Sequence, residues 1–257
     1  MSKEARIRAR ELREAQAQAA RRRRNRMRLL GAIGGAVIVG LLAAIVAVVI
    51  NSAAKGTGKP TAAASGPLVV PGNLSSTGAM PVGAAGAPVT LEVYLDYMCP
   101  ACGRFEKANN AEIDRLTKAG TVRLELRPIS FLDKQSQGTR YSTRAANAVA
   151  TVVDKAPGSV WAFTTALYAH QPEEGSTGLT DGQIADLARD IGVSEDVVGT
   201  FGAGTFEPWV AKTTNDAFAA GVTGTPTIKI NGRVFSGDAY STGPLTQAIE
   251  AAAAGAK

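Results

Sequence analysis

Hydrophobic side chains form one long uninterrupted stretch near the start of the chain, at residues 29–50, where 22 consecutive positions carry no charge. As a helix this stretch is about 33 Å long, which is enough to cross the hydrocarbon layer of a bilayer. A cleaved signal peptide usually has an apolar region of only about 7–15 residues after a short basic region. Because 28 residues precede this stretch, the pattern predicts a single transmembrane helix that stays attached to the protein.

From Val89 on, apolar positions first alternate with polar ones, then repeat at helical spacing, and finally alternate again. Alternation predicts β-strands, and a spacing of three to four residues predicts helices. The predicted strands are 89–95, 121–130, 226–231 and 233–237, and the predicted helices that pack with them are 99–120 and 243–256. Residues 132–220 have helical character, and Asn231-Gly232 is typical of a hairpin turn. The order predicts an α/β domain over 89–257 with a helical insertion at about 132–220.

Residues 51–88, between the apolar stretch and this domain, have a different composition. Of these 38 residues, 28 are Gly, Ala, Ser, Thr or Pro, and none is aromatic. Such a composition buries little apolar surface, so it predicts a flexible linker. The short run Leu68-Val69-Val70 is the part of it that could add an edge strand to the domain.

Charge is distributed unevenly along the chain. The net charge is +6, but residues 1–28 hold 11 Lys and Arg against three Asp and Glu, so the rest of the chain is close to neutral. This excludes a basic nucleic-acid-binding domain, although contact of the tail itself with nucleic acid or anionic lipid stays open as the less favoured alternative. Since basic residues flanking a membrane helix stay cytoplasmic, we expect residues 1–28 inside the cell and the domain outside it.

Cys99 and Cys102 are the two cysteines of the chain, which has a single histidine. A structural zinc site normally takes four Cys or His ligands, so we expect no metal. With Cys99 at the N-cap of the predicted helix, Pro100 takes the first helical position and Cys102 lies one turn on. The unpaired N–H groups and the dipole at a helix start lower a thiol pKa. The pattern predicts Cys99 as the nucleophile of a redox-active dithiol and Cys102 as the resolving thiol.

Three stretches of the chain resemble the DsbA-like branch of the thioredoxin superfamily. They are VTLEVYLDYMCPAC, which ends in the Cys-Pro-Ala-Cys motif with Pro100 and Ala101 between the cysteines, then WAFTTALYAHQ, and GVTGTPTIKING. The resemblance implies a thioredoxin-like fold with a helical insertion. It also implies that Thr225 and a cis Pro226 face the dithiol and bind the substrate.

The resemblance further implies an extracytoplasmic thiol–disulfide oxidoreductase that introduces disulfides into exported cysteine-containing proteins. Such a protein needs no cofactor of its own, and a membrane quinone-linked thiol oxidase is its expected partner for re-oxidation. With the predicted anchor, the expected location is the cell membrane, single-pass, with the N-terminus cytoplasmic. Two alternatives stay open: a reductase or isomerase of exported thiols, and a non-catalytic peptide-binding or chaperone module on the same fold.

Two departures from the family bear on redox strength. Many members have a buried acid six residues before the first cysteine, where this chain has Val93, and DsbA has a histidine between its cysteines, where this chain has Pro100-Ala101. Loss of a contact that stabilises the thiolate weakens an oxidant by about 30 mV per pKa unit. We therefore expect a potential between about −120 and −270 mV, the values of DsbA and thioredoxin.

Overall fold

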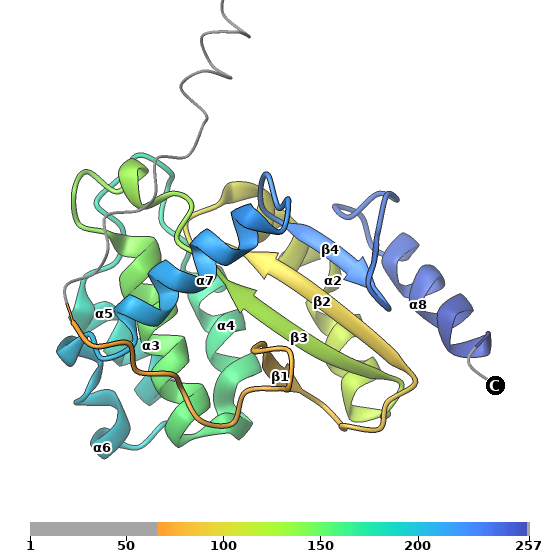
Figure 1. The fold of residues 1–257 in the computed structure, drawn as a ribbon, viewed down its shortest axis with the longest axis horizontal. Helices are drawn as coiled ribbons and strands as arrows, with labels where there is room; N and C mark the ends of the chain where they lie inside the picture. Colours follow the sequence, from red (N-terminus) through yellow and green to blue (C-terminus); the bar gives the residue numbers. More distant parts are fainter. Residues whose placement is uncertain (1–65, 256–257) are drawn as a thin grey trace, which may run out of the picture. The chain divides into compact units, whose positions relative to one another are not determined.

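The computed structural model describes residues 66–255, which form a mixed sheet with helices around it (Figure 1). The predicted tail at 1–28, the predicted anchor at 29–50 and the start of the predicted linker lie outside these residues. Among residues 66–255, no helix has the length and apolar character needed to cross a bilayer. The predicted α/β domain is confirmed, whereas the anchor stays a prediction.

Five strands form the sheet in the order β1-β3-β2-β4-β5. Their bounds are Met80–Val82 for β1, Val89–Leu95 for β2, Val122–Pro128 for β3, Thr227–Ile230 for β4 and Arg233–Val234 for β5. β2 and β3 are parallel because helix α2 connects them, and the other pairs are antiparallel. The pairing of β2 with both β3 and β4 places the end of β2 in the middle of the sheet.

Helices cover both faces of the sheet and extend beyond one side of it. Their bounds are Pro100–Lys118 for α2, Tyr141–Lys155 for α3, Val160–Ala169 for α4, Asp181–Asp190 for α5, Glu195–Val198 for α6, Glu207–Ala219 for α7 and Pro244–Ala254 for α8. Three short 3₁₀ turns lie at Asp133–Gln135, Pro157–Ser159 and Phe201–Ala203. In Figure 1, α7 crosses in front of β3 while α2 lies behind the sheet, and α3 to α6 gather beside it. The insertion expected at 132–220 therefore supplies α3 to α7.

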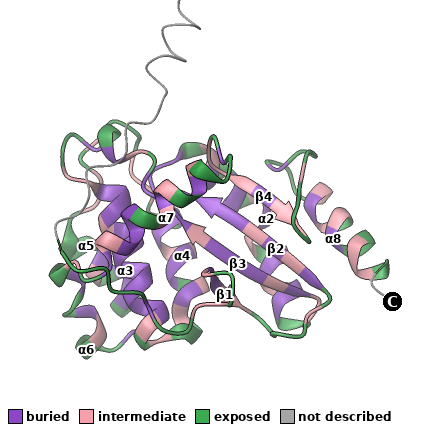
Figure 2. Ribbon diagram, viewed as in Figure 1, coloured by how far each residue is buried: buried purple, intermediate pink, exposed green. Residues whose placement is uncertain are grey.

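The core is continuous from the sheet into the insertion. β2 and β3 are largely buried (Figure 2), with side chains such as Leu91, Val93, Leu124 and Leu126 almost completely inaccessible. Each such side chain contributes about 1.5–3 kcal/mol when it leaves water. Central strands that are buried on both faces hold the end of β2 in a fixed position, and the cysteines follow directly after it.

The linker prediction is wrong for residues 66–88, which pack on the domain. β1 pairs with β3, and Ala79 and Met80 are buried. The N–H of Gly72 donates to Asp154 Oδ1 at 2.6 Å, which attaches the segment to α3. The many small residues of this segment conceal its packing in the sequence, because the contacts that hold it are a few backbone hydrogen bonds and the buried side chain of Met80. Leu68-Val69-Val70 forms no strand and is exposed.

The C-terminal strands are shorter than the sequence predicts. β5 ends at Val234, three residues before the expected end, because both of its side chains are exposed and it has one neighbour in the sheet. The hairpin turn itself is as expected: Asn231 and Gly232 both have positive φ, at 47° and 78°. A two-residue hairpin turn needs a left-handed backbone conformation at both of its residues, and Asn and Gly adopt this conformation readily.

Candidate active site

The two cysteines lie where β2 gives way to α2. Cys99 is the N-cap of α2, with an extended backbone at φ −72° and ψ 115°, and Pro100 begins the helix. The N–H of Cys99 donates to the carbonyl of Asp96 at 3.0 Å, which closes the turn before the helix. Cys102 lies in the first helical turn, and both cysteines are free thiols. The predicted helix start is confirmed, and Cys99 is 7% exposed.

The environment separates the two thiols by their pKa values. Hydrogen bonding from the Cys102 thiol lowers the pKa of Cys99 from its ordinary value of 9.0 to about 6, helped by the N–H groups of Cys102 and Ala101, while burial opposes the shift. Burial raises the pKa of Cys102 well above 9.0, and the adjacent Cys99 raises it further. Near neutral pH the pair therefore holds one negative charge, on Cys99.

A cis peptide bond joins Thr225 and Pro226 beside the first cysteine. The sulfur of Cys99 lies 3.3 Å from the Thr225 carbonyl oxygen, 126 residues away along the chain. Antiparallel pairing of Tyr94 with Thr227 brings these segments together at the end of β2. The structure thus gathers the dithiol and the Thr225–Pro226 bond at one place, as the resemblance implies.

Asp96 is a buried carboxylate whose part in the site the sequence analysis missed. Its oxygens accept from the N–H of Met98 at 2.8 Å, the N–H of Leu132 at 2.8 Å and the hydroxyl of Ser142 at 2.7 Å. Burial raises the pKa of Asp96 to about 7, against these hydrogen bonds. The carboxylate connects the turn before Cys99 to the loop after β3 and to α3. Its position three residues before Cys99 was the available signal.

A second buried acid, Glu106, lies one helical turn after Cys102. It lines a narrow, mostly apolar cavity together with Val93 and Tyr168, and burial raises the pKa of its carboxyl. Val93 itself is 1% exposed, as expected for the position where many family members carry an acid. In this chain the acid in that region of the core comes from α2 instead of β2.

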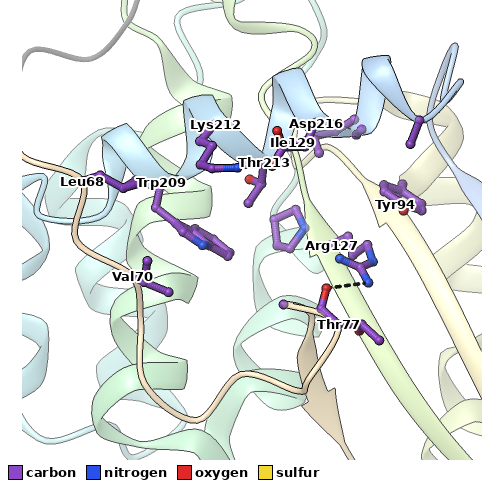
Figure 3. Close-up of a pocket in the computed structure, with 14 residues that line it drawn as sticks. Leu68, Val70, Thr77, Tyr94, Arg127, Ile129, Trp209, Lys212, Thr213 and Asp216 are labelled. Carbon is purple, nitrogen blue, oxygen red and sulfur yellow. Dashed lines mark hydrogen bonds and ion pairs between the residues drawn. The ribbon is translucent and has the colours of Figure 1, made fainter.

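A separate cavity of about 370 Å³ lies between α7, β3 and the segment before β1 (Figure 3). Trp209 and Val70 form part of its apolar wall, and Arg127 lies at its other end, donating to the carbonyl of Thr77 at 3.1 Å. Neither cysteine lines this cavity. Among residues 66–255, no group of three His, Cys, Asp or Glu side chains is arranged to hold a metal ion.

A strand that leads into a Cys-Pro-Ala-Cys helix start, next to a cis-proline from a neighbouring strand, defines a thioredoxin-like dithiol protein. The thioredoxin family model matches residues 75–251. The chain therefore belongs to the thioredoxin family, as a DsbA-like member whose relatives include thiol–disulfide oxidoreductases.

Similar proteins include curated sequences and solved structures. Disulfide bond formation protein D of Bacillus subtilis is 29% identical over 168 residues, which cover 64% of this chain and 73% of that protein. The structure of BdbD from Bacillus subtilis matches with a TM-score of 0.60 and 26% identity, covering 73% of this chain and all of that one. DsbG from Mycobacterium tuberculosis matches with a TM-score of 0.58 and 26% identity, covering 72% and 97%.

The same kind of domain also occurs within longer proteins. The serine/threonine-protein kinase PknE of Mycobacterium tuberculosis is 30% identical over 127 residues, which are 48% of this chain. The matched part is 22% of the kinase, so this chain corresponds to about a fifth of that relative.

Proposed function

We propose that this protein is an extracytoplasmic thiol–disulfide oxidoreductase that introduces disulfides into exported, cysteine-containing proteins. The observation that carries the proposal is the geometry of the dithiol: Cys99 is the N-cap of α2 and lies beside the cis Thr225–Pro226 bond, with Cys102 buried in the first helical turn. In agreement with this geometry, the pKa of Cys99 is lowered to about 6 and that of Cys102 is raised. A thiol with a low pKa is a good leaving group in thiol–disulfide exchange. The names of its relatives, which include disulfide bond formation protein and thiol-disulfide oxidoreductase, agree with this activity.

The reaction begins with a disulfide between Cys99 and Cys102. A substrate thiolate attacks Cys99 Sγ, the bond between the two cysteines breaks, and the Cys102 sulfur leaves and takes up a proton because its pKa is high. A second substrate thiolate then attacks the substrate sulfur of the mixed disulfide. Cys99 leaves as a thiolate, and the substrate gains a disulfide while the two electrons stay on the dithiol.

Burial of the second thiol supports Cys99 as the sulfur that reacts with substrates. Cys102 is 1% exposed and lies beneath the first helical turn, whereas Cys99 is at the N-cap beside Thr225 and Pro226. In the proposed complex, the extended substrate segment that carries the mixed disulfide lies along the backbone of Thr225, and Pro226 contacts the sulfurs.

The direction of exchange follows from the stability of the Cys99 thiolate. Lowering the pKa of Cys99 stabilises the reduced dithiol and makes the couple more oxidising. We propose a potential between about −120 and −270 mV, and re-oxidation by a membrane quinone-linked thiol oxidase. A reductase or isomerase is the second candidate, favoured by the absence of a histidine between the cysteines.

Exchange with a reduced peptide that carries two cysteines tests the activity. The full-length protein, oxidised beforehand, should convert an equimolar amount of the peptide to its disulfide in a single turnover, and Cys99→Ala should not. Equilibration in glutathione buffers, followed by alkylation and mass measurement, then gives the potential. A potential at or below that of thioredoxin would assign the protein to the reductases. Binding of the peptide without any thiol–disulfide exchange would show that the protein is a non-catalytic peptide-binding module.

A further inference from the structure

The end of α4 contacts the turn that precedes the dithiol through side chains alone. The Tyr168 hydroxyl donates to the carbonyl of Asp96 at 3.1 Å. The side-chain amide of Gln171, two residues past the helix end, donates to the carbonyl of Tyr97 at 3.1 Å and to that of Cys99 at 2.9 Å. Three carbonyls of the turn therefore receive a donor from the helical insertion, about 70 residues further along the chain.

Gly103 makes room for this contact. It directly follows Cys102 in α2, where a glycine costs about 0.5–1 kcal/mol relative to alanine. A Cβ at this position would overlap Gln171 Oε1 and lie 3.1 Å from Gln171 Cδ. Alanine at this position would therefore displace the Gln171 amide, which is the far end of a flexible side chain. Gly103 and Gln171 form a matched pair in which the unfavourable helix residue permits the close approach of the amide.

The Cys99 carbonyl is the point where this contact reaches the reactive sulfur. That carbonyl accepts the first helical hydrogen bond, from the N–H of Gly103 at 3.1 Å, in addition to the Gln171 amide. Two donors fix the orientation of the peptide group that follows Cys99. The N–H groups of Ala101 and Cys102, which stabilise a negative sulfur, belong to the same turn. The amide also offsets the negative end of a carbonyl dipole next to that sulfur.

We propose that Gln171 is a positioning residue for the dithiol: it holds the Cys99 turn in the form in which backbone N–H groups face the sulfur, and it thereby sets the thiol–disulfide equilibrium of the pair. The proposal rests on the proposed exchange function and extends it, because it gives the helical insertion a part in determining redox strength. Gln171 does not touch the reacting sulfur and is not a catalytic residue.

Two substitutions remove the contact in independent ways. Gln171→Ala deletes the amide, and Gly103→Ala displaces it while improving the helix propensity of α2. Each variant should raise the pKa of Cys99, measured as the midpoint of its alkylation profile, by about 0.5–1 unit, as expected when one hydrogen bond is lost. Each should also shift the equilibrium with glutathione three- to tenfold toward the disulfide form, so that the protein becomes a weaker oxidant. The double variant should match the single variants, because both remove one contact.

A third variant and two controls separate hydrogen-bond donation from packing. Gln171→Glu keeps the shape but replaces the donor by a carboxylate that faces two carbonyls, so its shift should be larger and in the same direction. Gln137→Ala removes another amide of the insertion, which donates to the carbonyl of Gly175 at 2.7 Å, and should leave both measurements unchanged. Gly182→Ala, in the first turn of α5, where an added Cβ meets only the Thr180 hydroxyl at an ordinary contact distance of 3.9 Å, controls for a glycine change in a helix.

The measurements are the pH profile of Cys99 alkylation and the glutathione equilibrium of the full-length protein, with thermal unfolding alongside. If Gln171→Ala and Gly103→Ala lower the melting temperature but leave both redox measurements within twofold of the starting protein, Gln171 is only a packing residue and the proposal is wrong. Neither measurement uses a protein substrate, so failure of the proposed exchange activity would show separately, as absent peptide oxidation with an unchanged glutathione equilibrium.

Discussion

At the scale of single residues, the position of Cys99 in the backbone has more effect on its pKa than its exposure does. The residue is 7% exposed, and burial by itself would raise the pKa of a thiol, yet the pKa is lowered to about 6. The difference comes from donors that converge on one sulfur: the Cys102 thiol and the N–H groups of the first helical turn. Cys102 lies deeper in the same turn, and burial raises its pKa instead of lowering it.

The division of roles between the cysteines predicts which variant traps substrates. Cys102→Ala leaves Cys99 able to form a mixed disulfide but removes the thiol that would release it. This variant should accumulate disulfide-linked complexes with exported proteins on non-reducing gels, at least tenfold more than the unsubstituted protein. Cys99→Ala should accumulate almost none, because the remaining thiol is 1% exposed. Equal trapping by both variants would contradict this assignment of roles.

The lowered pKa of Cys99 also predicts a pH dependence of stability that only the reduced protein has. A thiol whose pKa is lower when folded stabilises the folded state fully above the unfolded value near 9 and loses this effect as the pH falls to about 6. The melting temperature of the reduced protein minus that of the oxidised protein should therefore rise from pH 6 to pH 8.5. Other groups, such as Asp96, are present in both forms and largely cancel. A flat difference would show that Cys99 is not stabilised as a thiolate.

At the scale of elements, the turn between β2 and α2 is held from three directions. Asp96 accepts from its own turn, from the loop after β3 and from α3. The end of α4 adds Tyr168 and Gln171 on the carbonyl side. A turn that is fixed on both its donor and its acceptor groups has little freedom to change the geometry of the dithiol.

Removal of the Asp96 carboxylate should therefore be costly. Asp96→Ala leaves two buried N–H groups and one hydroxyl without an acceptor, so the free energy of unfolding should fall by about 3 kcal/mol. Ser142→Ala removes one of these donors together with its need for a partner and should cost about 1 kcal/mol. Chemical denaturation measures both. Similar losses for the two variants would mean that Asp96 does not coordinate the three elements.

The segment before β2 gives a second prediction at this scale. An N-terminal truncation through residue 82 removes β1 and exposes the backbone of β3, whereas a truncation through residue 65 leaves the described fold intact. The longer truncation should lower the melting temperature by about 5 °C or more and promote aggregation, because it uncovers a strand edge. Equal melting temperatures would restore the original prediction that this segment is a linker.

At the scale of the whole molecule, short-range sequence patterns predicted the order of elements and the position of the dithiol at a helix start, and the family resemblance implied the Thr225–Pro226 segment. They could not predict contacts such as Gln171 with Cys99, because tertiary packing sets these contacts between residues 72 positions apart. β1 was missed for a related reason: a segment of three residues with a proline in its middle is too short to give an alternating pattern, and it forms a strand because the edge of β3 is available.

The charge distribution makes a prediction about the complete chain. If residues 29–50 cross the membrane with the basic tail inside, protease added to intact spheroplasts should remove the redox domain and leave a small membrane-bound fragment. A cytoplasmic protein measured in the same sample should stay intact, as the control for leakage. Protection of the domain in intact spheroplasts would reverse the orientation and contradict an oxidising role outside the cell.

The two outermost strands, β1 and β5, are three and two residues long. Unfolded polypeptides readily add to a long free strand edge, and natural sheets avoid this by keeping their outer strands short. A protein that handles unfolded secreted chains encounters such polypeptides constantly, and a sticky edge would hold them after the chemistry is complete. Because β1 and β5 leave so little unpaired backbone, a substrate of the proposed reaction would be held mainly by its disulfide bond to Cys99 and would diffuse away once that bond is exchanged.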